Sequence, residues 1–348
     1  FGTHKIPDGW VIVAAGNPPQ YNKSVREFDI VTLDRVKRIE VKEDYSVWRS
    51  YALKNKVHPS ILAYLDLKTE QFYKIEATAD GYAFVTARGW EDLSRILWMY
   101  EESGLGITVE FLFEYLQHEE VARDFLGFYQ LCKKIKEEYG LMQILEGTRG
   151  EEKLEKEILK LKETEFDARV AILTFLSDGI HQKIESYDKK EQKVQIQYQE
   201  AKRLLEQLEN KKETDRFSEL LGRKIEQEKH AFLVKKEQGL LTKEEKWEKE
   251  QQREWLEELK NAWKQSGTKS GTEQELIRTC FNQKREAQKQ EKEKMQEILE
   301  RAFEFVGHAF GDGQESAMFV ERLSMDECIL KFIQKNGCSA YQKAGACI

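Results

Sequence analysis

Apolar and polar residues follow the three- and four-residue steps of amphipathic helices along most of this chain, with a different pattern in roughly its first forty residues. Trp10 to Ala15 is a short apolar run closed by two prolines. It predicts a buried parallel strand that presents Asn17 at its carboxyl edge. Ser24 to Arg35 has a loosely helical spacing, and Lys37 to Val41 alternates charged and β-branched residues like a short strand. We therefore expect a small α/β segment ahead of a mostly α fold.

A set of short helices is predicted from residue 44 to residue 140. Asp44 can cap a helix through Asn55, and Pro59 is suited to open a second helix through Leu67. Phe72 to Phe84 is irregular or extended. A third helix is expected to begin near Gly89 and Trp90, and two or three more follow, running through Tyr139 and ending at Gly140.

Beyond Glu151 the apolar positions recur among many glutamates and lysines, which predicts long amphipathic helices. Thr242 and Glu245 form a capping box ahead of a helix with three tryptophans. Ser324 with Glu327 is expected to cap a last helix, ended by Gly337. The other predicted segments are long helices at 154–208, 217–241 and 273–308, a flexible break at Ser266 to Thr272, and a turn at Gly311 to Gly313.

These long helices could be a membrane-surface element, a nucleic-acid clamp or antiparallel helical hairpins of coiled-coil type. Their polar faces mix Glu and Lys, and the chain has a formal net charge of -7 and a pI of about 5.7. Neither a nucleic-acid nor a membrane partner is expected, because no basic excess or long apolar run is present. Packed antiparallel hairpins are favoured over a solvated, partly disordered region.

The cysteines and histidines give little support for metal or nucleophilic chemistry. Five cysteines without a C-x-x-C motif indicate reduced thiols in a cytoplasmic protein. The six histidines are scattered, so no zinc site is predicted. The G-x-S-x-G motif of serine hydrolases is absent. Phe310 to Glu315 is predicted to form a turn, because it lacks the spaced ligands of a calcium loop.

Three polar side chains in apolar surroundings are the candidate functional residues: Asn17 in G-N-P-P, Arg35 in L-D-R-V and Arg88 in V-T-A-R-G-W-E-D-L-S. An amide can donate to a phosphate and accept from water at once, and guanidinium groups bind phosphate oxygens. Each residue alone is commonly a turn residue or a surface cation. Their order and spacing together favour a phosphate-sensing role.

The three motifs resemble the second half of a MoxR-type AAA+ ATPase, over about Val11 to Glu102. The resemblance implies that Asn17 is the sensor-1 residue, Arg35 the arginine finger and Arg88 the sensor-2 arginine of a helical lid. Val36 replaces the usual phenylalanine of D-R-F, and Ala87 replaces the usual proline of T-P-R. Neither change affects a phosphate-contacting atom.

The resemblance also implies an architecture and partners. The expected domains are the end of an α/β AAA+ core at 1–42, a helical lid at 43–140, a long helical extension at 151–265 and a C-terminal helical region at 273–348. Family members assemble as hexameric rings, and many are encoded with a partner that carries a von Willebrand factor A domain. The implied activity is ATP hydrolysis coupled to remodelling or maturation of a partner protein.

The residues that hold the nucleotide in such ATPases are missing from the sequence. There is no G-x-x-x-x-G-K-[ST] and no apolar strand that ends in Asp-Glu. ATP and Mg²⁺ are therefore expected only with an upstream N-terminal half, and this chain alone is expected to be inactive. The alternative hypothesis is a noncatalytic helical adaptor or scaffold that retains part of an ATPase core.

Overall fold

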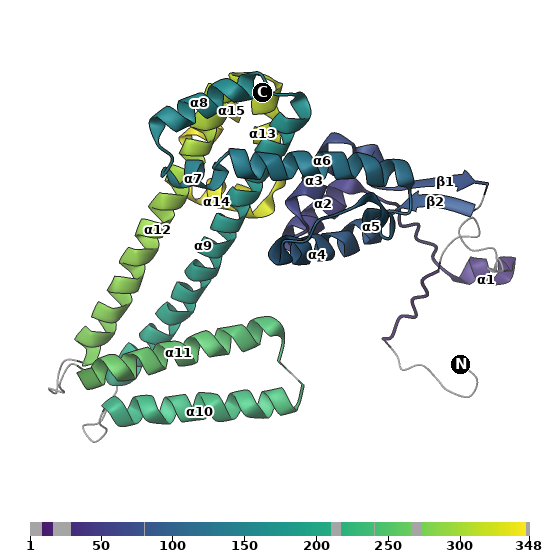
Figure 1. The fold of residues 1–348 in the computed structure, drawn as a ribbon. Coiled ribbons are helices and arrows are strands. Elements are labelled where there is room, and N and C mark those ends of the chain that lie inside the picture. The colour runs from purple at the N-terminus through teal and green to yellow at the C-terminus, as the bar shows by residue number, and fades with distance from the viewer. Residues whose placement is uncertain are drawn as a thin grey trace. The chain divides into compact units, whose positions relative to one another are not determined.

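The computed structural model describes residues 9–16, 29–79, 81–209, 217–239, 241–265 and 273–345 (Figure 1). Most of these residues are helical, and the only sheet among them has two strands. The predicted mostly α fold with a long helical extension is confirmed. The chain divides into two compact units, Phe1–Asp44 and Tyr45–Ile348, which we describe separately.

The first unit has one regular element among its described residues, the short helix α1 (Ile30–Arg35). The strands predicted at 10–15 and 37–41 are wrong, since both segments are irregular here. Their side chains are open to solvent, with exposed fractions of 82% for Val11, 85% for Val13 and 92% for Val41. A strand requires a neighbour to take its backbone hydrogen bonds, and none of the described residues of this unit supplies one.

The second unit opens with the predicted helices α2 (Tyr45–Lys54) and α3 (Pro59–Leu67). A 3-10 turn (Thr69–Gln71) leads into an antiparallel hairpin, β1 (Lys74–Thr78) and β2 (Gly81–Val85), where an irregular or extended stretch was predicted. The chain then continues through α4 (Ala87–Ser103), α5 (Val109–Phe113), α6 (Glu119–Glu138) and α7 (Leu141–Glu146). Helix α4 starts slightly earlier than predicted because Thr86 caps it.

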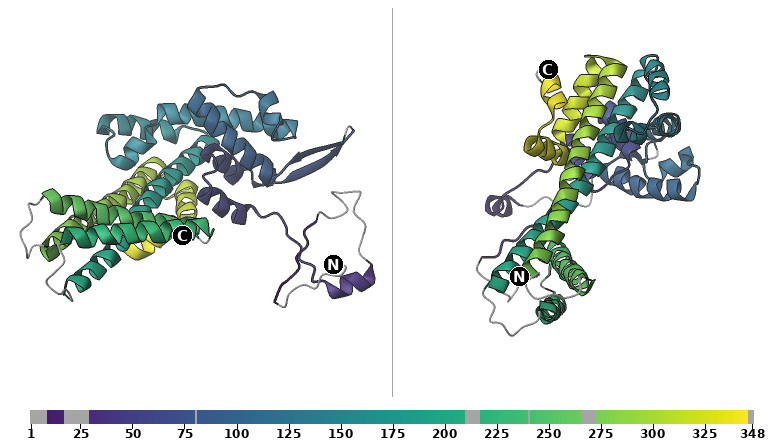
Figure 2. Two further views of the ribbon diagram at one scale, coloured as in Figure 1. Left: turned by 90° about the horizontal axis from the view of Figure 1, so that it is seen from below. Right: turned by 90° about the vertical axis from the view of Figure 1, so that its left-hand side faces the viewer.

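Long helices make up the rest of the unit: α8 (Glu151–Lys162), α9 (Phe166–Glu209), α10 (Phe217–Glu237), α11 (Lys243–Gln265) and α12 (Glu273–Phe310). Helices α9 and α12 pack side by side, and α10 packs on α11 (Figures 1 and 2). The expected capping box is present, with Glu245 N donating to Thr242 Oγ1 at 3.1 Å and Thr242 N donating to Glu245 Oε2 at 2.9 Å. The described helices are therefore packed hairpins. The break predicted at 266–272 lies outside the described residues.

Three shorter helices end the described chain: α13 (Gln314–Met325), α14 (Glu327–Asn336) and α15 (Ser339–Gly345). The prediction that Ser324 caps the helix ending at Gly337 is wrong, because Ser324 belongs to α13 and its hydroxyl donates to Val320 O at 2.7 Å. Asp326 is the actual cap of α14. Gly337 ends that helix at φ +77°, as predicted.

Two groups of buried apolar side chains stabilise the second unit. The larger core includes Tyr64, Trp90 and Phe125 from the short helices together with Tyr187 of α9 and Phe332 of α14. The residues expected to form a helical lid therefore share one core with the helices that follow. A smaller core joins α9, α10, α11 and α12 through Leu204, Phe217, Leu221, Trp255, Leu259, Trp263 and Ile277. Within the described residues, no helix is both long and apolar enough to cross a membrane.

Candidate functional site

The three residues predicted to sense phosphate do not form a described cluster. Asn17 lies outside the described residues. Arg35 is the last residue of α1 in the first unit, and Arg88 lies in the first turn of α4 in the second unit. Both arginines are exposed to solvent.

Arg35 lies on a helix that is fixed locally at its start. Asp29 caps α1, its Oδ1 accepting the Thr32 N–H at 2.7 Å. Ile30 and Val31 on the same helix are 84% and 60% exposed, so the described part of the first unit does not cover its apolar side chains.

Arg88 lies in the first turn of α4, and contacts of its neighbours fix the start of this helix. Thr86 Oγ1 accepts the Gly89 N–H at 3.3 Å, and the buried Trp90 donates its Nε1–H to Gln71 O at 3.2 Å. A Cβ atom on Gly89 would come within 2.6 Å of Tyr115 O, so only glycine fits at this close approach. In the described part of the chain, Arg88 has no hydrogen bond or ion pair, and its guanidinium group is free to bind a ligand.

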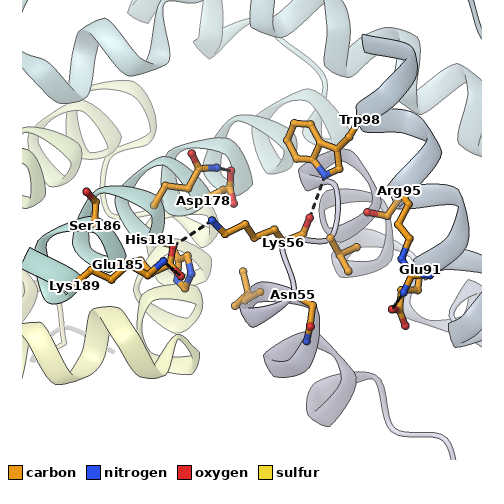
Figure 3. A pocket seen from close by; sticks show the side chains of 14 residues that line it. Asn55, Lys56, Glu91, Arg95, Trp98, Asp178, His181, Glu185, Ser186 and Lys189 are labelled. Carbon is orange, nitrogen blue, oxygen red and sulfur yellow. Dashed lines mark hydrogen bonds and ion pairs between the residues drawn. The ribbon is translucent and has the colours of Figure 1, made fainter. Parts of the chain in front are cut away.

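A pocket of about 820 Å³ lies in the second unit between the α2–α3 turn, α4 and α9 (Figure 3). Its lining combines both charges with an indole ring, since Lys56, Arg95 and Lys189 face Glu91, Asp178, Glu185 and Trp98. Most of these charges already pair with one another, since Arg95 pairs with Glu91 and both Lys56 and Lys189 pair with Glu185.

Lys56 spans this pocket from an unusual backbone position. Its φ of +56° is the only positive φ outside glycine among the described residues. Trp98 donates its Nε1–H to Lys56 O at 3.0 Å, which holds the turn, and Lys56 Nζ lies 3.5 Å from Glu185 Oε2. Residues in strained backbone positions often occur at functional sites, and this position orients the amine across the pocket.

His181 on the α9 wall connects the pocket with the start of α14. Its Nδ1 lies 2.7 Å from Asp326 Oδ2, while Asp326 Oδ1 accepts the N–H groups of Cys328 at 3.0 Å and Ile329 at 3.1 Å. Cys328 Sγ lies 3.5 Å from Asp188 Oδ2 on α9. The Nδ1, carboxylate and Sγ atoms of His181, Asp326 and Cys328 lie within 4.8 Å of one another and could hold a metal ion.

Burial and nearby carboxylates shift several pKa values around this group. Desolvation raises the pKa of Asp178 to about 6. Desolvation would lower the pKa of His181, but the hydrogen bond and negative charge of Asp326 outweigh it and raise the value. Desolvation, reinforced by Asp188 and Asp326, raises the pKa of Cys328 to about 12. Cys328 is therefore a protonated thiol at neutral pH and a poor nucleophile.

Sequence reasoning missed this pocket and the His181 group. The two sides of the group are separated by 145 residues, and no local spacing on α9 marks His181 as a partner of a helix cap. The short D-E-C motif at Asp326 to Cys328 was the only available signal, and the prediction placed that cap on Ser324.

Comparisons of the chain with protein-family models, curated proteins and solved structures found no match.

Proposed function

We propose that this chain is the C-terminal part of a MoxR-type AAA+ ATPase that couples ATP hydrolysis to the remodelling or maturation of a partner protein. The observation that carries the proposal is the position of Arg88, an exposed guanidinium group in the first turn of a firmly held helix.

Arg88 occupies a place where a cation is unfavourable for the helix itself. The N-terminal end of a helix has a partial positive charge, which disfavours a cationic side chain there by roughly 0.3–1 kcal/mol. A bound phosphate group would reverse this effect, because the guanidinium and the helix end both attract an anion. The cap at Thr86 and the close packing at Gly89 would transmit phosphate binding at Arg88 to the whole of α4.

The exposed apolar side chains of the first unit also support the proposal. Trp10 is 75% exposed, and the apolar side chains of Val11, Val13, Ile30 and Val41 are exposed as well. An α/β nucleotide-binding core would cover such a segment and convert its extended residues into paired strands. In that setting Arg35 would reach the nucleotide of a neighbouring subunit, and Asn17 would orient the attacking water.

The proposed holoenzyme requires groups that this sequence does not contain. A phosphate-binding loop and an acidic strand end in the nucleotide-binding core would hold ATP and Mg²⁺. We place the protein in the cytoplasm as a hexameric ring, with a von Willebrand factor A domain protein as its partner. These assignments rest on the family resemblance of the three motifs.

A noncatalytic helical adaptor is the second candidate. The absence of G-x-x-x-x-G-K-[ST] from the sequence favours it, as do the pocket of mixed charge and the long packed helices. In this case Arg88 would be a surface cation without a nucleotide role.

Nucleotide binding by the natural polypeptide that contains this chain separates the two candidates. For Arg88→Ala we expect the ATP affinity to fall by about 10- to 100-fold, since a hydrogen bond to a charged group contributes roughly 1.5–3 kcal/mol. Arg123→Ala is the matched control, because Arg123 is an exposed arginine near the start of α6 that pairs with Glu119. Equal ATP affinities of the wild type and both variants would favour the adaptor.

A further inference from the structure

The start of α14 and the middle of α9 bring three different metal-binding atom types together. His181 supplies an imidazole nitrogen, Asp326 a carboxylate oxygen and Cys328 a sulfur, all within 4.8 Å of one another. Nitrogen, oxygen and thiolate sulfur are the ligands that Zn²⁺ uses in proteins. We propose that these three residues form a binding site for a borderline divalent cation, with Zn²⁺ as the natural ion. This proposal is independent of the nucleotide role proposed above.

Asp326 is held in the orientation that a monodentate metal ligand needs. Its Oδ1 accepts the backbone N–H groups of Cys328 and Ile329, so this oxygen is fixed by the helix end. Oδ2 points to His181 Nδ1 at 2.7 Å. Metal-binding carboxylates are commonly held in this way by hydrogen bonds to their second oxygen.

The same contacts have a plain structural explanation as a helix cap with a hydrogen-bonded histidine. That explanation accounts for Asp326 and His181, but it does not require a sulfur atom beside them. Cys328 Sγ is close to both donors and also lies 3.5 Å from Asp188 Oδ2. Metal binding would release the Cys328 proton to solvent, and the positive charge of the ion would offset the nearby carboxylates that otherwise keep the thiol protonated.

Small side-chain movements would bring the three ligand atoms to distances that suit a bound ion. Zn–N and Zn–S bonds are about 2.0 and 2.3 Å, so two tetrahedral ligands lie roughly 3.5 Å apart. The Cys328 sulfur would therefore move toward the other two atoms, while His181 Nδ1 and Asp326 Oδ2, which are 2.7 Å apart, would separate slightly. The fourth position would be filled by water, as in zinc sites with three protein ligands.

The pocket provides a route for a cation to this site. His181 lines the pocket, and Asp178 and Glu185 flank it on the same helix, one turn before and one turn after. Lys56 and Lys189 pair with Glu185, at 3.5 and 2.9 Å. Asp178 has no lysine or arginine within ion-pair distance among the described residues, so negative charge lies beside the histidine.

Cobalt titration of the purified 348-residue chain tests the proposal, after reduction and treatment with a chelator. Co²⁺ replaces Zn²⁺ in such sites, and a bound thiolate gives a sulfur-to-cobalt charge-transfer band. We expect this band to saturate at one equivalent of Co²⁺ and to disappear when Zn²⁺ is added. Zn²⁺ should also raise the Tm, because it binds only the folded chain.

Three variants make the test specific. Cys328→Ser should abolish the charge-transfer band. Asp326→Asn should weaken Co²⁺ binding by at least about tenfold while an amide oxygen still caps α14. Cys338→Ser is the control, since Cys338 is a buried thiol that lies near Glu300 instead of this group, and it should bind Co²⁺ like the wild type.

The proposal would be overturned by a wild-type chain that gives no thiolate band with Co²⁺. It would equally be overturned by a band of unchanged intensity in Cys328→Ser that is folded by circular dichroism.

Discussion

Arg322 of α13 contacts Asp66 at the end of α3, with Nη2 3.3 Å from Oδ2, and both side chains are buried. Arg49 of α2 binds the same carboxylate, its Nε donating to Oδ1 at 2.8 Å, and the Tyr45 hydroxyl donates to Oδ1 at 2.6 Å. Arg322 Nη1 also donates to Val170 O on α9 at 3.0 Å. One carboxylate therefore links the first helices of the second unit to its last ones.

Removal of this carboxylate should destabilise the second unit strongly. Asp66→Ala leaves two buried guanidinium groups without their counter-ion, and we expect a loss of about 3–5 kcal/mol in the free energy of unfolding. Denaturant unfolding followed by circular dichroism measures this loss. Glu138→Ala is the control, because Glu138 pairs with Lys134 on the surface at 3.9 Å and should leave the unfolding midpoint nearly unchanged. Similar midpoints for the two variants would contradict the structural role of Asp66.

Two helical glycines should respond in opposite directions to alanine. A Cβ atom at Gly89 would meet the Tyr115 backbone oxygen at 2.6 Å, so Gly89→Ala must displace the turn after α5 from α4 and should cost about 1–3 kcal/mol. No atom lies within 4 Å of the corresponding position at Gly127 in the exposed face of α6. Gly127→Ala should therefore stabilise the chain by about 0.5–1 kcal/mol. Thermal unfolding of both variants checks the pair, and a stabilising Gly89→Ala would contradict the packing described for α4.

His58 should make stability depend on pH near neutrality. The ring is fully buried, its Nδ1 accepts the Ser60 N–H at 3.2 Å, and its Nε2 lies 3.2 Å from Glu101 Oε1. Burial lowers the pKa of His58 below its usual value of 6.5. The unfolded chain therefore takes up a proton below about pH 6.5 that the folded chain does not, and stability falls as the pH falls.

His58→Asn isolates this contribution, because asparagine can still cap α3 but does not titrate. The difference in free energy of unfolding between wild type and variant should shrink as the pH is lowered from 8 to 5, with a slope of at most about 1.4 kcal/mol per pH unit. Parallel profiles of the two proteins over this range would mean that the pKa of His58 is the same in the folded and the unfolded chain, which would contradict the effect of its burial.

The chain itself should not bind ATP tightly, because its sequence has neither a phosphate-binding loop nor a strand ending in Asp-Glu. Isothermal titration calorimetry of the 348-residue chain with ATP and Mg²⁺ should detect no tight binding. Tight binding that depends on Mg²⁺ would show that the nucleotide site is built from residues of this chain.

Local sequence signals predicted most helices of the second unit well. The start of α3, the capping box of α11 and the glycine after α14 were predicted from one or two residues each, since proline, Thr-x-x-Glu and glycine act on the backbone next to them. The strand at Trp10 to Ala15 was predicted from the same kind of local pattern and is wrong, because strand formation depends on a neighbour that periodicity does not reveal.

The groups that depend on distant contacts were not predictable from periodicity. Asp66 with Arg322 and His181 with Asp326 join residues far apart in the chain, and each residue looks like an ordinary surface charge in its own segment. Arg35 and Arg88 were selected by motif, and the structure adds that both are exposed at a helix end.

The most direct test of the proposed function is ATP turnover by the natural polypeptide that contains this chain, with Arg35→Ala compared with Arg38→Ala. Both are exposed arginines of the first unit, but only Arg35 lies in the D-R motif, while Arg38 pairs with Glu40. We predict that Arg35→Ala lowers turnover by about 10³-fold or more and leaves ATP affinity nearly intact, whereas Arg38→Ala behaves like the wild type. Turnover at the wild-type rate in Arg35→Ala would contradict the assignment of this residue as an arginine finger.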